Sequence, residues 1–166
     1  MDIAIKNKWV SLRGSSTVQD LNGRDILKVR GKFFSFTAKK FVCDLDGNVK
    51  YVVRNKFWRL FARKAFVLDE NKNILVRIRR KIFSFHDRYF IDSDIGDIEI
   101  VGNILQFNYD IIHNGVSVGH IARKVSLRDS FVLTIDETKY DIALFVALVI
   151  AIDNITDKKD ADSSSF

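Results

Sequence analysis

The main apolar run of this chain reads Asp141-Ile142-Ala143-Leu144-Phe145-Val146-Ala147-Leu148-Val149-Ile150-Ala151-Ile152-Asp153. The eleven residues between the two aspartates show no alternation of polar and apolar side chains, so this segment must be buried on every side. Its β-branched residues suit a central strand, but its length and the acidic residue at each end favour a helix, with Asp141 as N-cap or first-turn acid. Eleven residues are too few to cross a bilayer, which takes about 20. We therefore expect a buried helix over about residues 141–154.

Upstream of this run the chain repeats itself. Three segments share an acidic turn followed by a basic strand, with Asp20, Asp44 and Asp69 spaced by 24 and 25 residues. A more distant fourth copy runs from Asn114-Gly115 to Ile121-Ala122-Arg123-Lys124-Val125. Asn-Gly and Asp-Gly pairs favour type I′ hairpin turns, since Asn, Asp and Gly tolerate positive φ. Each copy therefore predicts a β-hairpin.

The strands after these turns alternate apolar and basic residues with a period of two, as in Val76-Arg77-Ile78-Arg79. Repeated hairpins of this length predict a meandering antiparallel sheet, and a long sheet tends to close on itself, which removes its exposed edges. We expect a mainly β fold: a closed antiparallel barrel of about twelve strands wrapped around the central hydrophobic C-terminal helix. Residues 1–155 would form this single domain, and residues 156–166 a disordered polar tail.

Composition excludes several classes of protein. The 166 residues include no proline and a single cysteine, Cys43, which rules out collagen-like, Pro-rich and disulfide-rich chains. The lack of proline also fits a strand-dense barrel, because proline cannot donate to a β ladder. The N-terminus shows no basic region followed by an apolar one, so a secretory signal is not expected. These features favour a cytoplasmic protein, with peripheral membrane attachment as an option.

The order of several motifs resembles the LURP-one-related family, including its short YxjI-like bacterial members. The motifs are Asp44-x-Asp46-Gly47, the segment Arg79-Arg80-Lys81-Ile82-Phe83-Ser84-Phe85, Gly115-x5-Ile121-Ala122-Arg123-Lys124, and the terminal apolar run. The resemblance covers about residues 1–155 and implies a twelve-stranded barrel around a hydrophobic helix. It supplies no catalytic residue. It also implies a kinship in fold with tubby C-terminal domains, which bind phosphoinositides, and with phospholipid scramblases, whose Pro-rich and Cys-rich segments have no counterpart here.

Charge is distributed unevenly along the chain. Residues 1–91 hold 21 Lys and Arg against 8 Asp and Glu, whereas residues 92–166 hold 6 against 13. Basic side chains at every second strand position point to one face of a sheet, and equivalent positions in neighbouring hairpins would stack. The candidate anion-binding residues are Arg30, Lys32, Arg54, Lys56, Arg77, Arg79 and Lys81. A second set of basic residues occupies equivalent positions and comprises Lys39, Lys40, Arg63, Lys64 and Arg88.

Two arginines do not share the phase of these candidate anion-binding residues. Arg80 and Arg123 fall in phase with the apolar Ile78 and Ile121, so each would point to the barrel interior or its mouth. An interior arginine needs a carboxylate, and the aspartates at the helix ends, Asp141 and Asp153, are candidate partners. We therefore predict that these four residues form ion pairs with a structural role, fixing the helix in the barrel.

Catalytic and metal-binding motifs are missing from the sequence. His113 and His120 flank the Asn114-Gly115 turn, but no third ligand completes a zinc pattern, and Asp92–Glu99 does not fit an EF-hand loop. Phosphate-binding and nucleophile-elbow glycine patterns are also missing. We expect a non-enzymatic binding module without a cofactor or metal, engaging anionic phospholipid or phosphoinositide headgroups through a basic face. The alternatives are a nucleic-acid binder, a protein-interaction scaffold and, less favoured, an enzyme at the barrel mouth.

Overall fold

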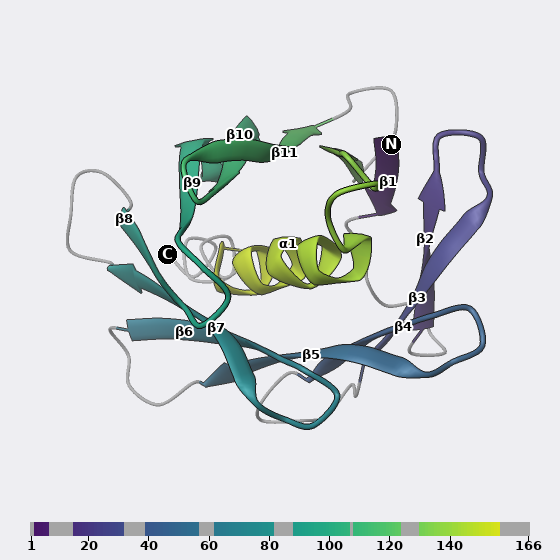
Figure 1. The fold of residues 1–166 in the computed structure, drawn as a ribbon, viewed down its shortest axis with the longest axis horizontal. Coiled ribbons are helices and arrows are strands. Elements are labelled where there is room, and N and C mark those ends of the chain that lie inside the picture. Colours follow the sequence, from purple (N-terminus) through teal and green to yellow (C-terminus); the bar gives the residue numbers. More distant parts are fainter. Residues whose placement is uncertain are drawn as a thin grey trace, which may run out of the picture.

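The fold of a computed structural model is mainly β, with one C-terminal helix, α1 (Figure 1). The structure describes residues 2–6, 15–31, 39–56, 62–81, 88–106, 108–123 and 130–156. Within these ranges the strands are β1 (Asp2–Lys6), β2 (Ser15–Asp20), β3 (Asp25–Gly31), β4 (Lys40–Cys43), β5 (Val49–Lys56), β6 (Ala62–Leu68), β7 (Ile74–Lys81), β8 (Arg88–Ser93), β9 (Ile98–Asn103), β10 (Asn108–His113), β11 (Val116–Arg123) and β12 (Ser130–Ile135). A 3₁₀ turn, η1 (Ile104–Gln106), joins β9 to β10.

Helix α1 (Ile142–Thr156) confirms the helical interpretation of the apolar run. Asp141 caps it as predicted: its Oδ1 accepts a 2.9 Å hydrogen bond from the Ala143 N–H, and its backbone carbonyl accepts from Phe145 N–H at 3.3 Å. The helix continues to Thr156, so Asp153 lies inside its last turns, and residue 156 is helical where a tail was expected. The rest of the predicted tail lies outside the described residues.

The helix runs through the centre of the molecule and the strands surround it (Figure 1). Residues 146–152 of α1 are almost fully buried. Strand positions facing the helix are buried too, among them Val53, Val67, Val76 and Ile78, each with no exposed surface. Burying a Val or Ile side chain contributes about 1.5–3 kcal/mol, so this helix–sheet contact is the main source of stability.

All twelve strands join in one antiparallel sheet, in the order β8-β7-β6-β5-β4-β3-β2-β1-β12-β11-β10-β9. Two meanders, β1–β8 and β9–β12, are thus joined by the pairing of β1 with β12, in which Ile3 lies opposite Leu133. The two outer strands of this order are β8 and β9, which follow each other in the chain.

Closure of the barrel is not confirmed, because no ladder joins β8 to β9 in the described part of the chain. Their linker, residues 94–97, does not close a hairpin between β8 and β9, because its backbone groups form hydrogen bonds with other parts of the chain. The Asp94 N–H donates to the Leu75 carbonyl, which belongs to β7, and the Asn114 N–H donates to the Asp97 carbonyl, each at 2.8 Å. The two ends of the linker are therefore held by different neighbours, and β8 and β9 diverge. We call this gap between β8 and β9 the seam.

One of the three predicted type I′ turns is confirmed and the other two differ from the prediction. Asn114 and Gly115 both have positive φ (51° and 76°), as a type I′ turn requires. In the Asp20 and Asp44 turns, Gly23 and Gly47 are left-handed (82° and 98°), whereas Asn22 and Asp46 are not among the residues with positive φ. These turns are of type I, closed by a left-handed residue that starts a bulge. The aspartate carboxylates stabilise them: Asp20 Oδ1 accepts from the N–H groups of Asn22 and Arg24 at 2.9 Å.

Candidate functional site: a basic face on the outer wall

The register of β5 to β8 brings seven basic positions onto one outer surface, which we call the basic face. Lys56 lies opposite Lys64, which lies opposite Arg79 on the next strand, so three cations form one row across the sheet. Lys81 lies opposite Arg88 in the row on one side, and Arg54 and Arg77 lie opposite Phe66 in the row on the other. The members of the basic face are Arg54, Lys56, Lys64, Arg77, Arg79, Lys81 and Arg88.

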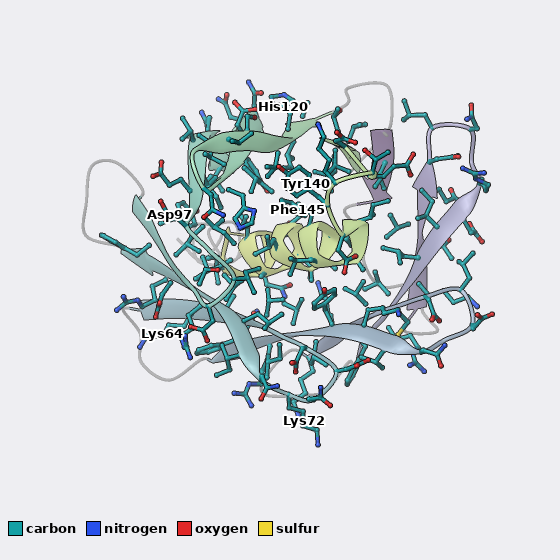
Figure 2. All side chains as sticks on the ribbon, in the orientation of Figure 1. Lys64, Lys72, Asp97, His120, Tyr140 and Phe145 are labelled. Carbon is teal, nitrogen blue, oxygen red and sulfur yellow. The ribbon has the colours of Figure 1, made fainter. Side chains whose placement is uncertain are left out.

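Burial shows that two of these positions, Lys64 and Arg79, face outward. Lys64 and Arg79 are exposed, whereas their strand neighbours Ala65 and Ile78 have no exposed surface. Figure 2 shows Lys64 on the outside of the sheet, away from α1. Opposed residues of antiparallel strands have Cβ atoms about 4.5–5.5 Å apart, and like charges in this arrangement destabilise a sheet. The sheet therefore sets basic positions of neighbouring strands side by side on its outer wall, but equivalent positions of two repeats, such as Arg54 and Arg77, lie two strands apart with β6 between them.

Two arginines at one side of the basic face have local partners. The guanidinium of Arg54 lies 5.7 Å from the ring centroid of Phe66, a cation–π contact. Arg77 Nη1 lies 3.7 Å from Asp92 and 3.5 Å from Asp94. Since both carboxylates are well exposed, this pairing contributes little to stability. The charge of Arg77 is therefore balanced locally by two carboxylates.

An exposed aromatic residue borders that row. Phe90 on β8 lies directly opposite Arg79, and 47% of its surface is exposed. A large apolar side chain beside a row of cations combines the two features that an amphipathic surface needs. Phe90 was not among the residues predicted from the sequence, although it follows Arg88 by two residues and therefore shares its face of the strand.

Arg30, one of the predicted anion-binding residues, contacts the turn between β4 and β5 instead of joining the basic face. Its Nη2 donates to the Gly47 carbonyl at 3.1 Å, its Nε lies 3.4 Å from the Sγ of Cys43, and the ammonium of Lys28 bonds to the Leu45 carbonyl. Both β3 cations therefore hold the turn between β4 and β5. Arg30 also lines a hollow of about 260 Å³ with Gly31, Phe41 and Val49. Lys32, the remaining member of the predicted set, lies outside the described residues.

The predicted ion pairs are described only in part. Arg80 keeps the regular register of β7, in phase with Ile78, and Arg123 occupies the end of β11, but the described residues do not include their side chains. Asp141 has other contacts: its Oδ2 accepts a 2.7 Å hydrogen bond from the Tyr51 hydroxyl. Asp153 is 1% exposed, and burial, together with the charge of Asp153, raises the pKa of Tyr109.

Lys40 from the second basic set turns inward. Its ammonium donates a 2.8 Å hydrogen bond to the side-chain oxygen of Asn154, near the C-terminus of α1. A cation is favourable there because the C-terminus of a helix carries partial negative charge. Residues 114 positions apart carry no sequence signal for such a contact.

The two histidines that flank the Asn114-Gly115 turn, His113 and His120, lie on opposite faces of the sheet. His113 is in phase with the buried Tyr109 and Ile111, whereas His120 is exposed and bonds to Asp110 at 2.8 Å on the outer side (Figure 2). They cannot share a metal ion. Across the described ranges, no group of three His, Cys, Asp or Glu residues is placed to hold one. Among the same residues, no helix has the length and apolar character needed to span a bilayer.

Comparison with known proteins agrees with this architecture. An X-ray structure of an Arabidopsis thaliana protein superposes with a TM-score of 0.61 at 20% sequence identity, covering 93% of this chain and 90% of that one. This likeness shows the fold alone. No curated protein sequence matches the chain. The family model described as LURP-one-related matches residues 1–153, which is nearly the whole folded region. The chain therefore belongs to the LURP-one-related family.

Proposed function

We propose that this chain is a non-enzymatic module that binds anionic phospholipid headgroups through the basic face. The observation that carries the proposal is the row of Lys56, Lys64 and Arg79, three like charges directly opposite one another on adjacent strands. Such a row costs stability in the free protein. Negative charges placed against it would remove that cost and add attraction.

The shape and chemistry of the surface favour a lipid bilayer. The row lies on an outer wall, where an extended anionic surface can reach it. Each Lys or Arg near an anionic membrane contributes about 1 kcal/mol, so the three basic positions of the row would supply about 3 kcal/mol. Phe90, half exposed beside Arg79, would enter the interfacial region in which aromatic side chains are favoured.

Vesicle co-sedimentation of the full chain tests the proposal. Vesicles of phosphatidylcholine alone are compared with vesicles that also contain phosphatidylserine. The double variant Lys64→Glu/Arg79→Glu reverses two charges of the row. The matched control, Lys50→Glu/Lys72→Glu, makes the same change in net charge at exposed positions at the other end of β5–β7.

We expect binding to the phosphatidylserine vesicles only. The row variant should lose about 30-fold in affinity, from two contacts of about 1 kcal/mol each, and the control variant much less. Equal binding to both vesicle types, no binding, or equal loss in the two variants would overturn the proposal. Stronger binding to a single-stranded oligonucleotide than to vesicles, falling steeply with salt, would assign the face to nucleic acid instead.

A further inference from the structure

The seam between β8 and β9 is built around His113. Asp97 N–H donates to the side-chain oxygen of Asn114 at 2.9 Å, and the ring Nε2 of His113 lies 2.9 Å from the Ile95 carbonyl. At Gly96 the linker has φ +116°, and a Cβ added there would come within 2.6 Å of that Nε2. Only glycine allows the linker to approach the ring this closely. The separation of β8 and β9 at the seam is therefore maintained by specific hydrogen bonds and by a glycine that no other residue can replace without a clash.

The shorter contact of His113 Nε2, to the Ile95 carbonyl, selects one tautomer of the imidazole ring. A carbonyl oxygen can only accept, so Nε2 of His113 carries a proton and donates to Ile95. With Nε2 protonated, the Asn114 amide nitrogen 3.4 Å away, itself a donor, cannot accept from it. In the neutral ring, Nδ1 is then a hydrogen-bond acceptor.

A cavity of about 100 Å³ opens at this point, over the first turns of α1. Its inner part is apolar, formed by the buried Ile98, Phe145 and Leu148. The aromatic rings continue in a chain along it: His113 meets Tyr140 edge to face at 6.4 Å, and Tyr140 meets Phe145 at 5.8 Å. Figure 2 shows Tyr140 and Phe145 between α1 and the strands above it.

The mouth of the cavity carries balanced charge. Lys139 and Asp141 are exposed there, and both are engaged: Lys139 pairs with Asp136 at 3.1 Å, and Asp141 accepts from Tyr51. One cation and one anion, each with a protein partner, give no preference for a charged ligand. The apolar interior favours burial of a small hydrophobic body.

We propose that this cavity binds a small neutral planar ring that carries one hydroxyl or N–H donor. The ring lies among Ile98, Phe145 and Leu148, in contact with the edge-to-face aromatic chain. The donor bonds to Nδ1 of His113. The cavity of about 100 Å³ is smaller than the roughly 150 Å³ of an engineered apolar cavity that holds benzene, so the ring would fill it and extend into the open mouth. This site is separate from the basic face.

Phenol and benzene are the probes, because they differ by the donor alone. Binding of each to the full chain is measured by protein-observed NMR titration. Leu144→Trp fills the cavity from α1. His113→Leu removes the acceptor, and His120→Leu makes the same change on the outer face of the sheet as a matched control.

We expect phenol to shift the amide signals of residues 95–98, 113 and 140–145 saturably, and to bind about fivefold more tightly than benzene, which corresponds to one neutral hydrogen bond. His113→Leu should abolish this preference, His120→Leu should keep it, and Leu144→Trp should abolish binding of both probes. If His113→Leu does not fold, the preference of the wild type and the Leu144→Trp result decide. No saturable binding, equal affinities for the two probes, or phenol binding retained in Leu144→Trp would overturn the proposal. Vesicle binding through the basic face stays unchanged in Leu144→Trp, so the two proposals fail separately.

Discussion

The hydroxyl of Tyr51, on β5, donates a 2.7 Å hydrogen bond to the carboxylate of Asp141, the residue that caps α1. One carboxylate thus fixes the start of the helix and ties it to the sheet. Burial, together with the hydrogen bond to Asp141, raises the pKa of the Tyr51 hydroxyl above its ordinary value of 10.0, so the donor keeps its proton.

Removing the Tyr51 hydroxyl should weaken the whole fold. For Tyr51→Phe we expect the free energy of unfolding to fall by about 1–2 kcal/mol, because the lost bond has a charged acceptor. Asp141→Ala should cost about 2–3 kcal/mol, since the cap is lost as well. Urea unfolding of both variants and of the double variant gives the coupling energy. Additive effects within about 0.3 kcal/mol would contradict a direct link.

Reversing one charge of the basic row should stabilise the free protein. Lys64→Glu replaces two repulsive cross-strand pairs, with Lys56 and Arg79, by attractive ones. We expect the free energy of unfolding to rise by about 0.5 kcal/mol at low salt, and the gain to shrink as salt screens the charges. Urea unfolding at two salt concentrations measures both effects, with Lys50→Glu as the control. A loss of stability at low salt would show that the row is not under repulsion.

The third turn of the repeat contains a correctable strain. Lys72 occupies the place of Gly23 and Gly47 with φ 70°, a left-handed conformation that costs a residue with a Cβ about 1–2 kcal/mol. Lys72→Gly should therefore raise the free energy of unfolding by about 0.5–1 kcal/mol, after the greater freedom of glycine in the unfolded chain is subtracted. The reverse exchange, Gly47→Lys, should lower it by a similar amount. Thermal unfolding of both variants checks the sign, and equal signs would refute the assignment.

Acid sensitivity should depend in part on the turn aspartates. The backbone N–H of Arg24 is the largest influence lowering the pKa of Asp20, and the side-chain amide of Asn48 plays this part for Asp44, both from the ordinary value of 3.8. A carboxyl with a lowered pKa stabilises the folded state above its unfolded value, and that stability is lost as the pH falls through the folded pKa.

We therefore expect Asp20→Asn and Asp44→Asn to be less stable than the wild type at neutral pH, with the difference narrowing below about pH 3.8. Asp46→Asn, in an exposed position of the second turn, serves as the control. Chemical unfolding across this pH range provides the measurement. A difference that is constant with pH would show that the carboxylate charge has no part in the turn.

Local patterns predicted the elements of this fold well. The apolar run became α1, capped by Asp141, and period-two alternation placed Arg77 and Arg79 outward with Val76 and Ile78 inward. Both predictions rest on interactions within a few residues. The closed barrel was inferred from the tendency of sheets to lose their edges, but the linker at Gly96 obtains its hydrogen bonds from two different neighbours.

Side-chain contacts over long sequence distances were beyond such patterns. Tyr51 and Asp141 are 90 residues apart, and Lys40 reaches Asn154 from a position that looked like part of a basic surface. The predicted type of the Asp20 and Asp44 turns was wrong, and the cause is a local interaction. An Asp-Gly or Asn-Gly pair permits two left-handed residues, but the Asp20 and Asp44 carboxylates bind the turn N–H groups and favour the type I form.

The position of α1 after the described strands in the chain has a consequence for synthesis on the ribosome. The wall of the core is translated first and α1 follows it, so the inward faces of the strands emerge before the helix that covers them. A nascent chain that has reached β12 holds all of the described strands but lacks the apolar helix that fills the space between them, and such intermediates aggregate readily. Translation of the final helical segment is therefore the step at which this protein gains its stability, and stalling before it would leave a chain that needs a chaperone.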